Sequence, residues 1–488
     1  MNRIFSSKFF FWVPVIFTGI LFFTVRNDPF FGDAISSTSR ATINIYDHHL
    51  LSFFYPVEHD PGHPTLYAWL LALCWTILGK SLIVSHAYSI AWFVFLFFIF
   101  SKIASLFLPG SSERNKTMLL FFAMPTALSM GAMMLNTTAL IALFLGSFYY
   151  ILTKNKKGFI LSASLMTLVH LQAPLLLLAI FFADLFLSRK EISVTQFIRN
   201  KFLSYSIPVA IFCIWLLVHY RHTGWLTSSP NYPDRGDLNS ISEIFKCWLM
   251  IIWRLIDYGM LPFYLVFGFA LLKKLGDRPL RISWLILIGV FGFSLSVMML
   301  SHYIAHRYLL GISLLTIIFV MNVLQYFQPK QKNILYLILL ISLVAGNFIF
   351  YPGKTIGDTT LAYRNYFKLE KELLKDFPDT VIFFSKAPVA ISSEISQLNK
   401  SKTEIKRITT EKLDELPAII QSNVSAEFSE ADKKLLTENF YGKSYESGAV
   451  YINVFLNPKF YEKPEGWKLR EPSQIENLLL ELKNKVRN

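Results

Sequence analysis

The sequence contains little charge for its length. Charged side chains make up 16% of its 488 residues, hydrophobic ones make up 53%, and the mean hydropathy is +0.43. A disordered chain or an ordinary soluble domain would carry more charge and fewer apolar residues. The composition therefore predicts an α-helical polytopic membrane protein, whose solvent is largely lipid.

Cysteines are also scarce, and their arrangement excludes two classes of small stabilised domain. The three cysteines (Cys74, Cys213 and Cys247) lie in or beside apolar runs. Their odd number argues against a disulfide framework, and their spacing matches no zinc-binding pattern. The chain also lacks a small-residue cleavage site after its first apolar run, so we expect that run to be an uncleaved span rather than a signal peptide.

Acidic residues are rare in the first part of the chain. Residues 1–352 hold 26 Lys and Arg against 13 Asp and Glu, whereas residues 353–488 hold 21 against 20. The excess positive charge thus belongs to the hydrophobic part, where it sets membrane orientation. A nucleic-acid-binding protein would instead carry a basic face on a soluble domain, so we expect no nucleic-acid partner.

Eleven apolar runs predict about 11 spans, most of them near the length that a bilayer core requires. With the N-terminus in the cytoplasm, most basic clusters fall on the inner side and the chain after residue 353 falls outside. The two short runs that meet at residue 170 predict a tight helical hairpin. The runs are 9–25, 81–107, 118–134, 137–152, 158–170, 173–187, 202–220, 247–272, 283–301, 308–327 and 333–350.

Two segments outside these runs complete the predicted organisation. Residues 64–79 are helical in pattern, but counting them as a span would move basic clusters outside. We therefore expect a juxtamembrane helix within a first outer loop, residues 26–80 of a membrane domain 1–352. Residues 353–488 predict a small mixed α/β extracytoplasmic domain, with helices at about 361–376 and 473–486 and strands at 380–384 and 449–455.

Polar residues gather on the predicted outer side. The first outer loop alone holds Asp28, Asp33, Asp47, Glu58 and Asp60, five of the 13 acids in the membrane part. It also holds four of the chain's histidines. A long polar loop between spans usually has a binding or catalytic role. A second outer loop, 221–245, is rich in Pro, Gly and Ser, which predicts mobility.

Three short motifs in this order resemble the GT-C glycosyltransferases, and in particular the protein O-mannosyltransferases and the aminoarabinose transferases of lipid A. They are Gly32-Asp33-Ala34 after the first span, Asp60-Pro61-Gly62-His63-Pro64 before the juxtamembrane helix, and His306-Arg307-Tyr308-Leu309-Leu310 before a late span. The sequence departs from the family pattern in having Ala34 in place of a second acid, Asn136 in place of an Asp and His170 in place of a Lys.

The resemblance implies a multi-pass glycosyltransferase of a bacterial inner membrane that takes a hexose or pentose from a polyprenyl-phosphate donor. The acceptor would be an extracytoplasmic protein, lipid or glycan of the cell envelope. Asp33 would be the general base, and Asp60 would be a second catalytic carboxylate. Cations and hydrogen-bond donors would hold the phosphate and the sugar. The candidate substrate-binding residues are His63, His170, His306, Arg307, Tyr308 and Asn136.

Other interpretations of these residues stay open. Glu58 and His59, with Asp60 and His63, could hold a divalent metal, although their spacing matches no established signature. Asp257 and Arg254 are three residues apart on one helix, which favours an internal ion pair. A transporter or flippase is one alternative function, although such a protein should show midplane charges and matching halves, which the sequence does not show. A non-catalytic subunit of an envelope polysaccharide assembly is the other alternative.

Overall fold

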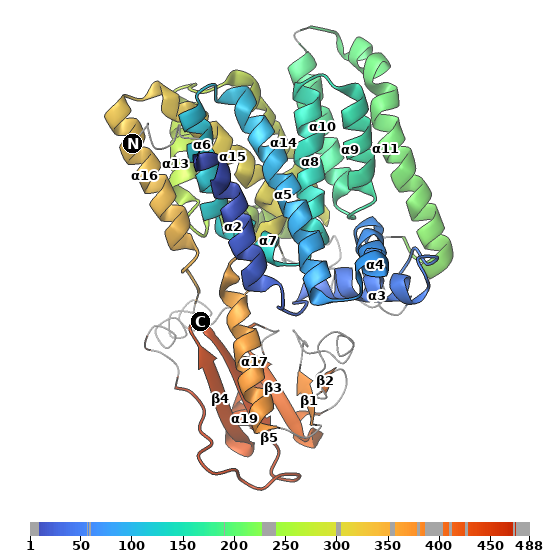
Figure 1. The fold of residues 1–488 in the computed structure, drawn as a ribbon, viewed down its shortest axis with the longest axis vertical. Coiled ribbons are helices and arrows are strands. Elements are labelled where there is room, and N and C mark those ends of the chain that lie inside the picture. Colours follow the sequence, from blue (N-terminus) through green and yellow to red (C-terminus); the bar gives the residue numbers. More distant parts are fainter. Residues whose placement is uncertain are drawn as a thin grey trace. The chain divides into compact units, whose positions relative to one another are not determined.

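Two compact units make up the computed structural model of the protein, one formed by Met1–Arg26 with Asp33–Asn347 and the other by Asn27–Gly32 with Phe348–Asn488. Figure 1 labels their helices and strands. The structure describes residues 9–55, 57, 60–189, 191–226, 241–298, 304–351, 357–377, 381–385, 404–408, 412–424, 428–471 and 474.

The larger unit is a bundle of apolar helices. Because lipid offers the backbone no hydrogen-bond partners, apolar runs of this kind satisfy their backbone groups within helices. Helix α15 is the most central, since nearly all of its residues are buried. The helices are α2 (Phe9–Val25), α5 (Leu82–Phe107), α6 (Ser111–Ala123), α7 (Pro125–Ala132), α8 (Asn136–Leu152), α9 (Lys156–Thr167), α10 (Ala173–Ser188), α11 (Val194–Thr223), α12 (Ile241–Ile256), α13 (Leu261–Leu272), α14 (Arg278–Met298), α15 (Leu310–Val323) and α16 (Pro329–Gly346).

Some of these helices are long enough to cross a bilayer alone. By length and composition, four described segments qualify (82–107, 194–223, 278–297 and 306–326), and the bent pair α12 and α13 would make a fifth. Four further apolar helices are shorter, and they lie in α2, α4, α8 and α10. Helices α9 and α10 form the hairpin that the sequence predicts (Figure 1). The total of about 11 spans stays a prediction.

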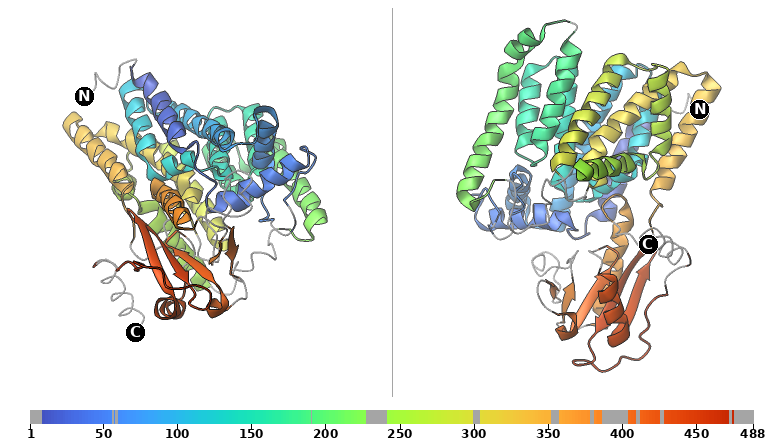
Figure 2. Two further views of the ribbon diagram at one scale, coloured as in Figure 1. Left: turned by 60° about the horizontal axis from the view of Figure 1, so that its bottom comes forward. Right: turned by 180° about the vertical axis from the view of Figure 1, so that it is seen from behind.

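Two runs that the sequence predicts as single helices are broken. Run 118–134 is divided between α6 and α7, because Pro125 forces Met124 into an extended conformation with ψ 120°. Run 247–272 bends by 106° between α12 and α13. At that corner Tyr258 and Gly259 both adopt positive φ, at 47° and 85°. Figure 2 (right) shows α12 running crosswise to the bundle helices.

The first outer loop is itself largely helical. It contains the π-helix η1 (Ile35–Ser39), α3 (Arg40–Asp47) and α4 (Leu66–Leu78). Helix α4 ends at Gly79, whose φ of 92° suits a residue without a side chain. Helices α3 and α4 share a small core, so the loop has an ordered shape. The members of this core are Ala41, Ile45, Tyr55, Ala68 and Ala72.

The smaller unit is built on a five-stranded sheet of order β2-β1-β3-β5-β4. Strands β1, β2 and β3 pair in parallel, and β5 pairs antiparallel with β3 and β4. Tyr445 of β4 contacts Asp376 of α17, whereas Leu436 of α19 shares a core with Ile419 and Phe455. Because side chains alternate along a strand, these contacts put α17 and α19 on opposite faces of the sheet. The strands are β1 (Ile382–Ser385), β2 (Glu404–Arg407), β3 (Ala418–Ser422), β4 (Tyr441–Ser447) and β5 (Val450–Leu456), and the helices are α17 (Arg364–Asp376) and α19 (Glu430–Asn439).

The segment Asn27–Gly32 packs within this smaller unit, although more than 300 residues separate it from α17. Phe31 stacks on Tyr363 with ring centroids 4.5 Å apart, and Asp28 accepts a hydrogen bond from Arg364 Nη2 at 3.3 Å. The sequence predicts α17, β1 and β5 but gives no signal for α19, β2, β3 or β4. The helix predicted at 473–486 lies outside the described residues, except for residue 474.

Candidate active site

An ion pair joins the two residues that the first and last motifs single out. Asp33 opens the helical stretch before η1, where its carbonyl oxygen accepts a 2.6 Å hydrogen bond from Ser37 Oγ. Arg307 lies in the 3-10 helix η3 (His306–Leu309), and its guanidinium donates to the Asp33 carboxylate. The Arg307 side chain is 7% exposed and that of Asp33 is 58% exposed. A buried cation thus meets a carboxylate that faces solvent.

Tyr308 completes the immediate surroundings of Arg307. Its hydroxyl accepts a hydrogen bond from Arg307 Nη2 at 3.2 Å, and the guanidinium carbon lies 4.9 Å from the ring centroid. A cation held over an aromatic face gains electrostatic attraction. The neighbouring residue therefore restricts the guanidinium to one orientation.

Two candidate residues that are far apart in the chain, His63 and His170, lie in contact with each other. Their rings stack with centroids 4.2 Å apart. His170 Nδ1 accepts a hydrogen bond from the backbone N–H of Gln172 at 3.1 Å. Burial, the neighbouring His63 and the positive charge of Arg307 together hold the pKa of His170 well below its usual value of 6.5. The imidazole of His170 is therefore neutral at pH 7, and Arg307 lies within electrostatic reach of it.

The turn that carries His170 is fixed from two sides. The backbone N–H of Leu66, at the start of α4, donates to the carbonyl oxygen of Leu168 at 3.1 Å. Asn136 Nδ2, at the start of α8, donates to the carbonyl oxygen of Val169 at 3.4 Å. Asn136 is itself buried. The structure thus places Asn136 beneath the site, where it holds the 168–172 turn.

Asp60 is held inside the protein rather than at an open surface. Its side chain is fully buried, and its carboxylate accepts hydrogen bonds from Gly62 N at 2.7 Å and from His219 Nε2 at 3.1 Å. His219 lies near the end of α11 and stacks on Trp215 at 4.9 Å. The pair joins the first outer loop to α11. This placement favours a structural role for Asp60 over the catalytic role that the sequence predicts.

His306 also has a partner within the protein. Its Nε2 lies 3.1 Å from Asp257 Oδ2, at the corner between α12 and α13. Arg254 Nη1 is 3.9 Å from the same carboxylate oxygen, which is the internal pair that the sequence favours. The Nε2 atom of His306 is therefore engaged by Asp257, which differs from the direct phosphate contact that the sequence predicts.

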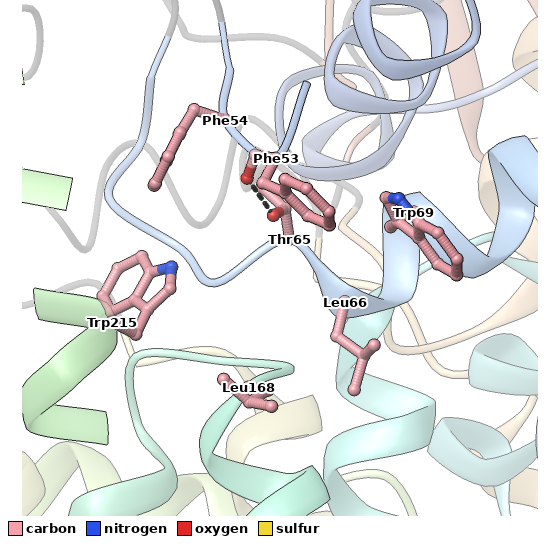
Figure 3. A pocket seen from close by; sticks show the side chains of 7 residues that line it. All are labelled: Phe53, Phe54, Thr65, Leu66, Trp69, Leu168 and Trp215. Atoms are coloured by element: carbon pink, nitrogen blue, oxygen red, sulfur yellow. Dashed lines mark hydrogen bonds between the residues drawn. The ribbon is translucent and has the colours of Figure 1, made fainter. Parts of the chain in front are cut away.

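Figure 3 shows an apolar cleft in the larger unit. Its volume is about 280 Å³. Thr65 and Leu66 in its wall follow His63 in the chain, and Leu168 precedes His170 by two residues. The residues that line it are Phe53, Phe54, Thr65, Leu66, Trp69, Leu168 and Trp215.

Only part of the predicted metal site lies among the residues that the structure describes. Among the residues that the structure describes, no group of three His, Cys, Asp or Glu side chains is placed to hold a metal ion. Glu58 and His59 lie outside the described residues, as does most of the second outer loop (227–240). A divalent metal at Glu58 and His59 stays a prediction.

Sequence reasoning missed His219, and it singled out Asp257 only as a partner of Arg254 and not of His306. His219 lies 159 residues from Asp60, and Asp257 lies 49 residues from His306. Asp257 was recognisable as an acid within an apolar run, which is a functional signal in a membrane protein. His219 carries no comparable signal, since it stands alone near the end of a long helix.

Comparison with known proteins gives a match in fold alone. No protein-family model and no curated protein sequence matches the chain. Two crystal structures of ArnT from Cupriavidus metallidurans do match it. The apo structure gives a TM-score of 0.54 at 11% identity, covering 94% of this chain and 100% of the other. The structure bound to undecaprenyl phosphate gives 0.51 at 10% identity, covering 93% and 99%. The protein therefore has the fold of ArnT, a GT-C aminoarabinose transferase, as the three sequence motifs predict.

Proposed function

We propose that the protein is a multi-pass membrane glycosyltransferase that moves a sugar from a polyprenyl phosphate to an extracytoplasmic acceptor. The observation that carries the proposal is the convergence of Asp33, Arg307, His63 and His170. These side chains come from distant parts of the chain. Asp33 pairs with Arg307, His63 stacks on His170, and His170 lies within electrostatic reach of Arg307. Structural packing alone does not require ionisable groups to gather in this way in a membrane protein.

The chemistry of lipid-phosphate sugars fits these side chains. The leaving phosphate is already a stable anion, so the reaction needs a base and a phosphate site more than a strong acid. We assign the phosphate to Arg307, because a guanidinium has five N–H donors and can hold a carboxylate and a phosphate together. His63 and the neutral imidazole of His170 would donate further hydrogen bonds, and Tyr308 would hold the guanidinium of Arg307 in its orientation.

Asp33 is the residue we assign as general base. The acceptor hydroxyl or amine would lose its proton to a carboxylate oxygen of Asp33, and its lone pair would form the new bond to the anomeric carbon. The phosphate would leave with the electrons of the broken carbon–oxygen bond. The exposure of Asp33 suits this role, since an acceptor must reach the carboxylate from outside while Arg307 stays buried.

The apolar cleft suits the lipid part of the donor. It is lined almost wholly by aromatic and aliphatic side chains, and its lining residues Thr65 and Leu168 are two positions from His63 and His170 in the chain. We propose that the isoprenoid chain lies there, with its phosphate directed toward Arg307. One of the two ArnT structures contains undecaprenyl phosphate, which supports a polyprenyl-phosphate donor for a protein of the same fold.

The proposed location is a bacterial inner membrane. We infer about 11 spans, counting α6 with α7 and α12 with α13 as one crossing each. The N-terminus would be cytoplasmic, with the site and the smaller unit outside. The distribution of Lys and Arg along the chain supports this orientation.

The test is a transfer assay with the purified full-length chain in lipid vesicles. A panel of undecaprenyl-phosphate pentoses and hexoses would be supplied with membrane extract as the source of acceptor. Release of free undecaprenyl phosphate that depends on both Asp33 and Arg307 would support the proposal. If no donor is consumed, and the chain instead moves lipid phosphate across the bilayer, a flippase replaces the transferase.

A further inference from the structure

A buried polar network lies directly behind Arg307. Asp257 accepts a hydrogen bond from His306 Nε2 at 3.1 Å, and a carboxylate can only accept, so Nε2 carries the proton. Arg254 Nε donates to the carbonyl oxygen of Ile304 at 3.1 Å. Arg254 near the end of α12 and Asp257 at the corner after it therefore bind the chain at Ile304 and His306, just before Arg307.

The corner that carries Asp257 is firmly held. Ser342 Oγ of α16 donates to the carbonyl oxygen of Gly259 at 2.9 Å. A side chain at Gly346 would meet the carbonyl oxygen of Tyr258 at 2.2 Å, so the backbones of the corner and α16 are in direct contact. The Tyr258 ring packs edge-on against His306 at 4.8 Å. The network therefore rests on a part of the bundle with little freedom to shift.

We propose that Arg254, Asp257 and His306 are positioning residues that aim Arg307 at the donor phosphate. The inference rests on the proposed function and deepens it. Successive side chains of a 3-10 helix are about 120° apart, so fixing the direction of His306 also fixes that of Arg307. With His306 held on Asp257, the guanidinium of Arg307 is turned toward Asp33.

The composition of the network supports this role. Charged and polar groups are costly within an apolar bundle, and they persist mainly where they serve a function. Asp257 and His306 are both buried. An apolar pair could fill the same space, but it would not specify the rotation of η3, because dispersion contacts have no directional preference.

The experiment measures binding of undecaprenyl phosphate to the full-length protein in detergent by native mass spectrometry. His306→Ala should weaken binding about tenfold, the usual effect of losing an oriented hydrogen bond to a charged group. His306→Gln restores a donor near the position of Nε2 and should recover most of the affinity. His86→Ala removes another buried imidazole, on α5, and should leave the affinity unchanged.

A double-mutant comparison separates positioning from a general loss of structure. In an Arg307→Ala background, His306→Ala should have no further effect on binding, because the group that His306 positions is gone. Equal losses in both backgrounds would overturn the proposal, and so would a loss with His306→Gln as large as with His306→Ala.

A second measurement needs no ligand. With the three native cysteines replaced by alanine, Arg307→Cys places a thiol at the end of the oriented turn. Its reaction with a small methanethiosulfonate should be slow, and it should become several times faster when His306→Ala is added but not when His86→Ala is added. Equal rates in the three proteins would overturn the positioning role. If the unmodified chain fails to bind undecaprenyl phosphate while these rates behave as expected, the donor assignment fails and the positioning of residue 307 stands.

Discussion

Asp33 and Arg307 differ in exposure, and this difference fits the separate roles that we propose for them. Arg307 is buried and held by Tyr308 as well as by Asp33, so its position is fixed before substrate arrives. Asp33 is more than half exposed and can reach an incoming acceptor. A preorganised cation with an accessible carboxylate beside it is what transfer from a phosphate leaving group requires.

Replacement of Asp33 by Asn should therefore reduce turnover without unfolding the protein. Asn keeps the shape but cannot take a proton, and general-base catalysis contributes about 10²–10⁴-fold to a rate. The measurement is release of free undecaprenyl phosphate per enzyme molecule. Asp47→Asn is the matched control, since Asp47 lies in the same loop, is 48% exposed and also has a cationic neighbour, Lys80 at 3.5 Å. Equal turnover in both variants would remove Asp33 as the base.

Substitution of Asp60 should lower the stability of the protein and largely spare its turnover, which is the opposite of what we expect for Asp33. The carboxylate of Asp60 is buried and accepts a hydrogen bond from His219, and losing a buried hydrogen bond to a charged group costs about 1.5–3 kcal/mol. Asp60→Ala should thus lower the midpoint of thermal unfolding of the purified protein, whereas Asp33→Asn should not. Turnover per folded molecule should stay within a few-fold of the unmodified protein. An unfolding midpoint unchanged by Asp60→Ala would contradict the structural role.

The residues of the site differ in how far the sequence reveals them. Asp33, His63 and Arg307 stand in short motifs whose order resembles a known family, so they could be named before their contacts were known. The partners of Asp60 and His306 could not, because His219 and Asp257 are distant in the chain and are brought to them by helix packing. A motif predicts which residues matter more readily than what each one contacts.

At the scale of elements, apolar periodicity predicts most helices of the bundle and fails where the backbone departs from a helix. The break at Met124 has a local cause in Pro125, which was visible in the sequence. The corner between α12 and α13 has two signals, Gly259, which adopts a φ of 85°, and Pro262 in the first turn of α13. In the smaller unit, the sequence did not predict β2 and β3, which are only four and five residues long, or β4, whose residues YGKSYES are mostly polar and give no apolar run.

The corner makes a testable prediction about stability. An alanine at Gly259 would need a positive φ, and its Cβ would lie 2.0 Å from the carbonyl oxygen of Ser342. Because that neighbour is backbone, α16 must move, and we expect a loss of at least about 2 kcal/mol in the free energy of unfolding. Gly268→Ala is the control, since a Cβ there meets no atom within 4 Å and α13 is helical. A thermal midpoint for Gly259→Ala equal to that for Gly268→Ala would show that the corner tolerates the change.

At the scale of the whole molecule, the uneven distribution of net charge along the chain predicts the orientation of the protein in the membrane. The membrane part carries a net charge near +13 (26 minus 13), while the chain after residue 352 is almost neutral (21 minus 20). Basic connections between spans are retained on the cytoplasmic side. With the predicted 11 spans, the residues of the proposed site fall in the other set of connections, where we propose that a lipid-linked sugar and an external acceptor meet.

Orientation can be measured with two matched cysteine positions in a chain whose native cysteines are replaced by alanine. Lys154 lies in a predicted inner connection and Lys434 lies on α19, and their side chains are 76% and 74% exposed. A membrane-impermeant maleimide added to intact spheroplasts should label Lys434→Cys and should label Lys154→Cys only after lysis. Their similar exposure means that a difference in labelling reports the side of the membrane rather than burial. The reverse pattern would place the smaller unit in the cytoplasm. Asp33 would then face the cytoplasm as well, because an even number of spans separates it from the smaller unit, and the acceptor would have to be sought on that side.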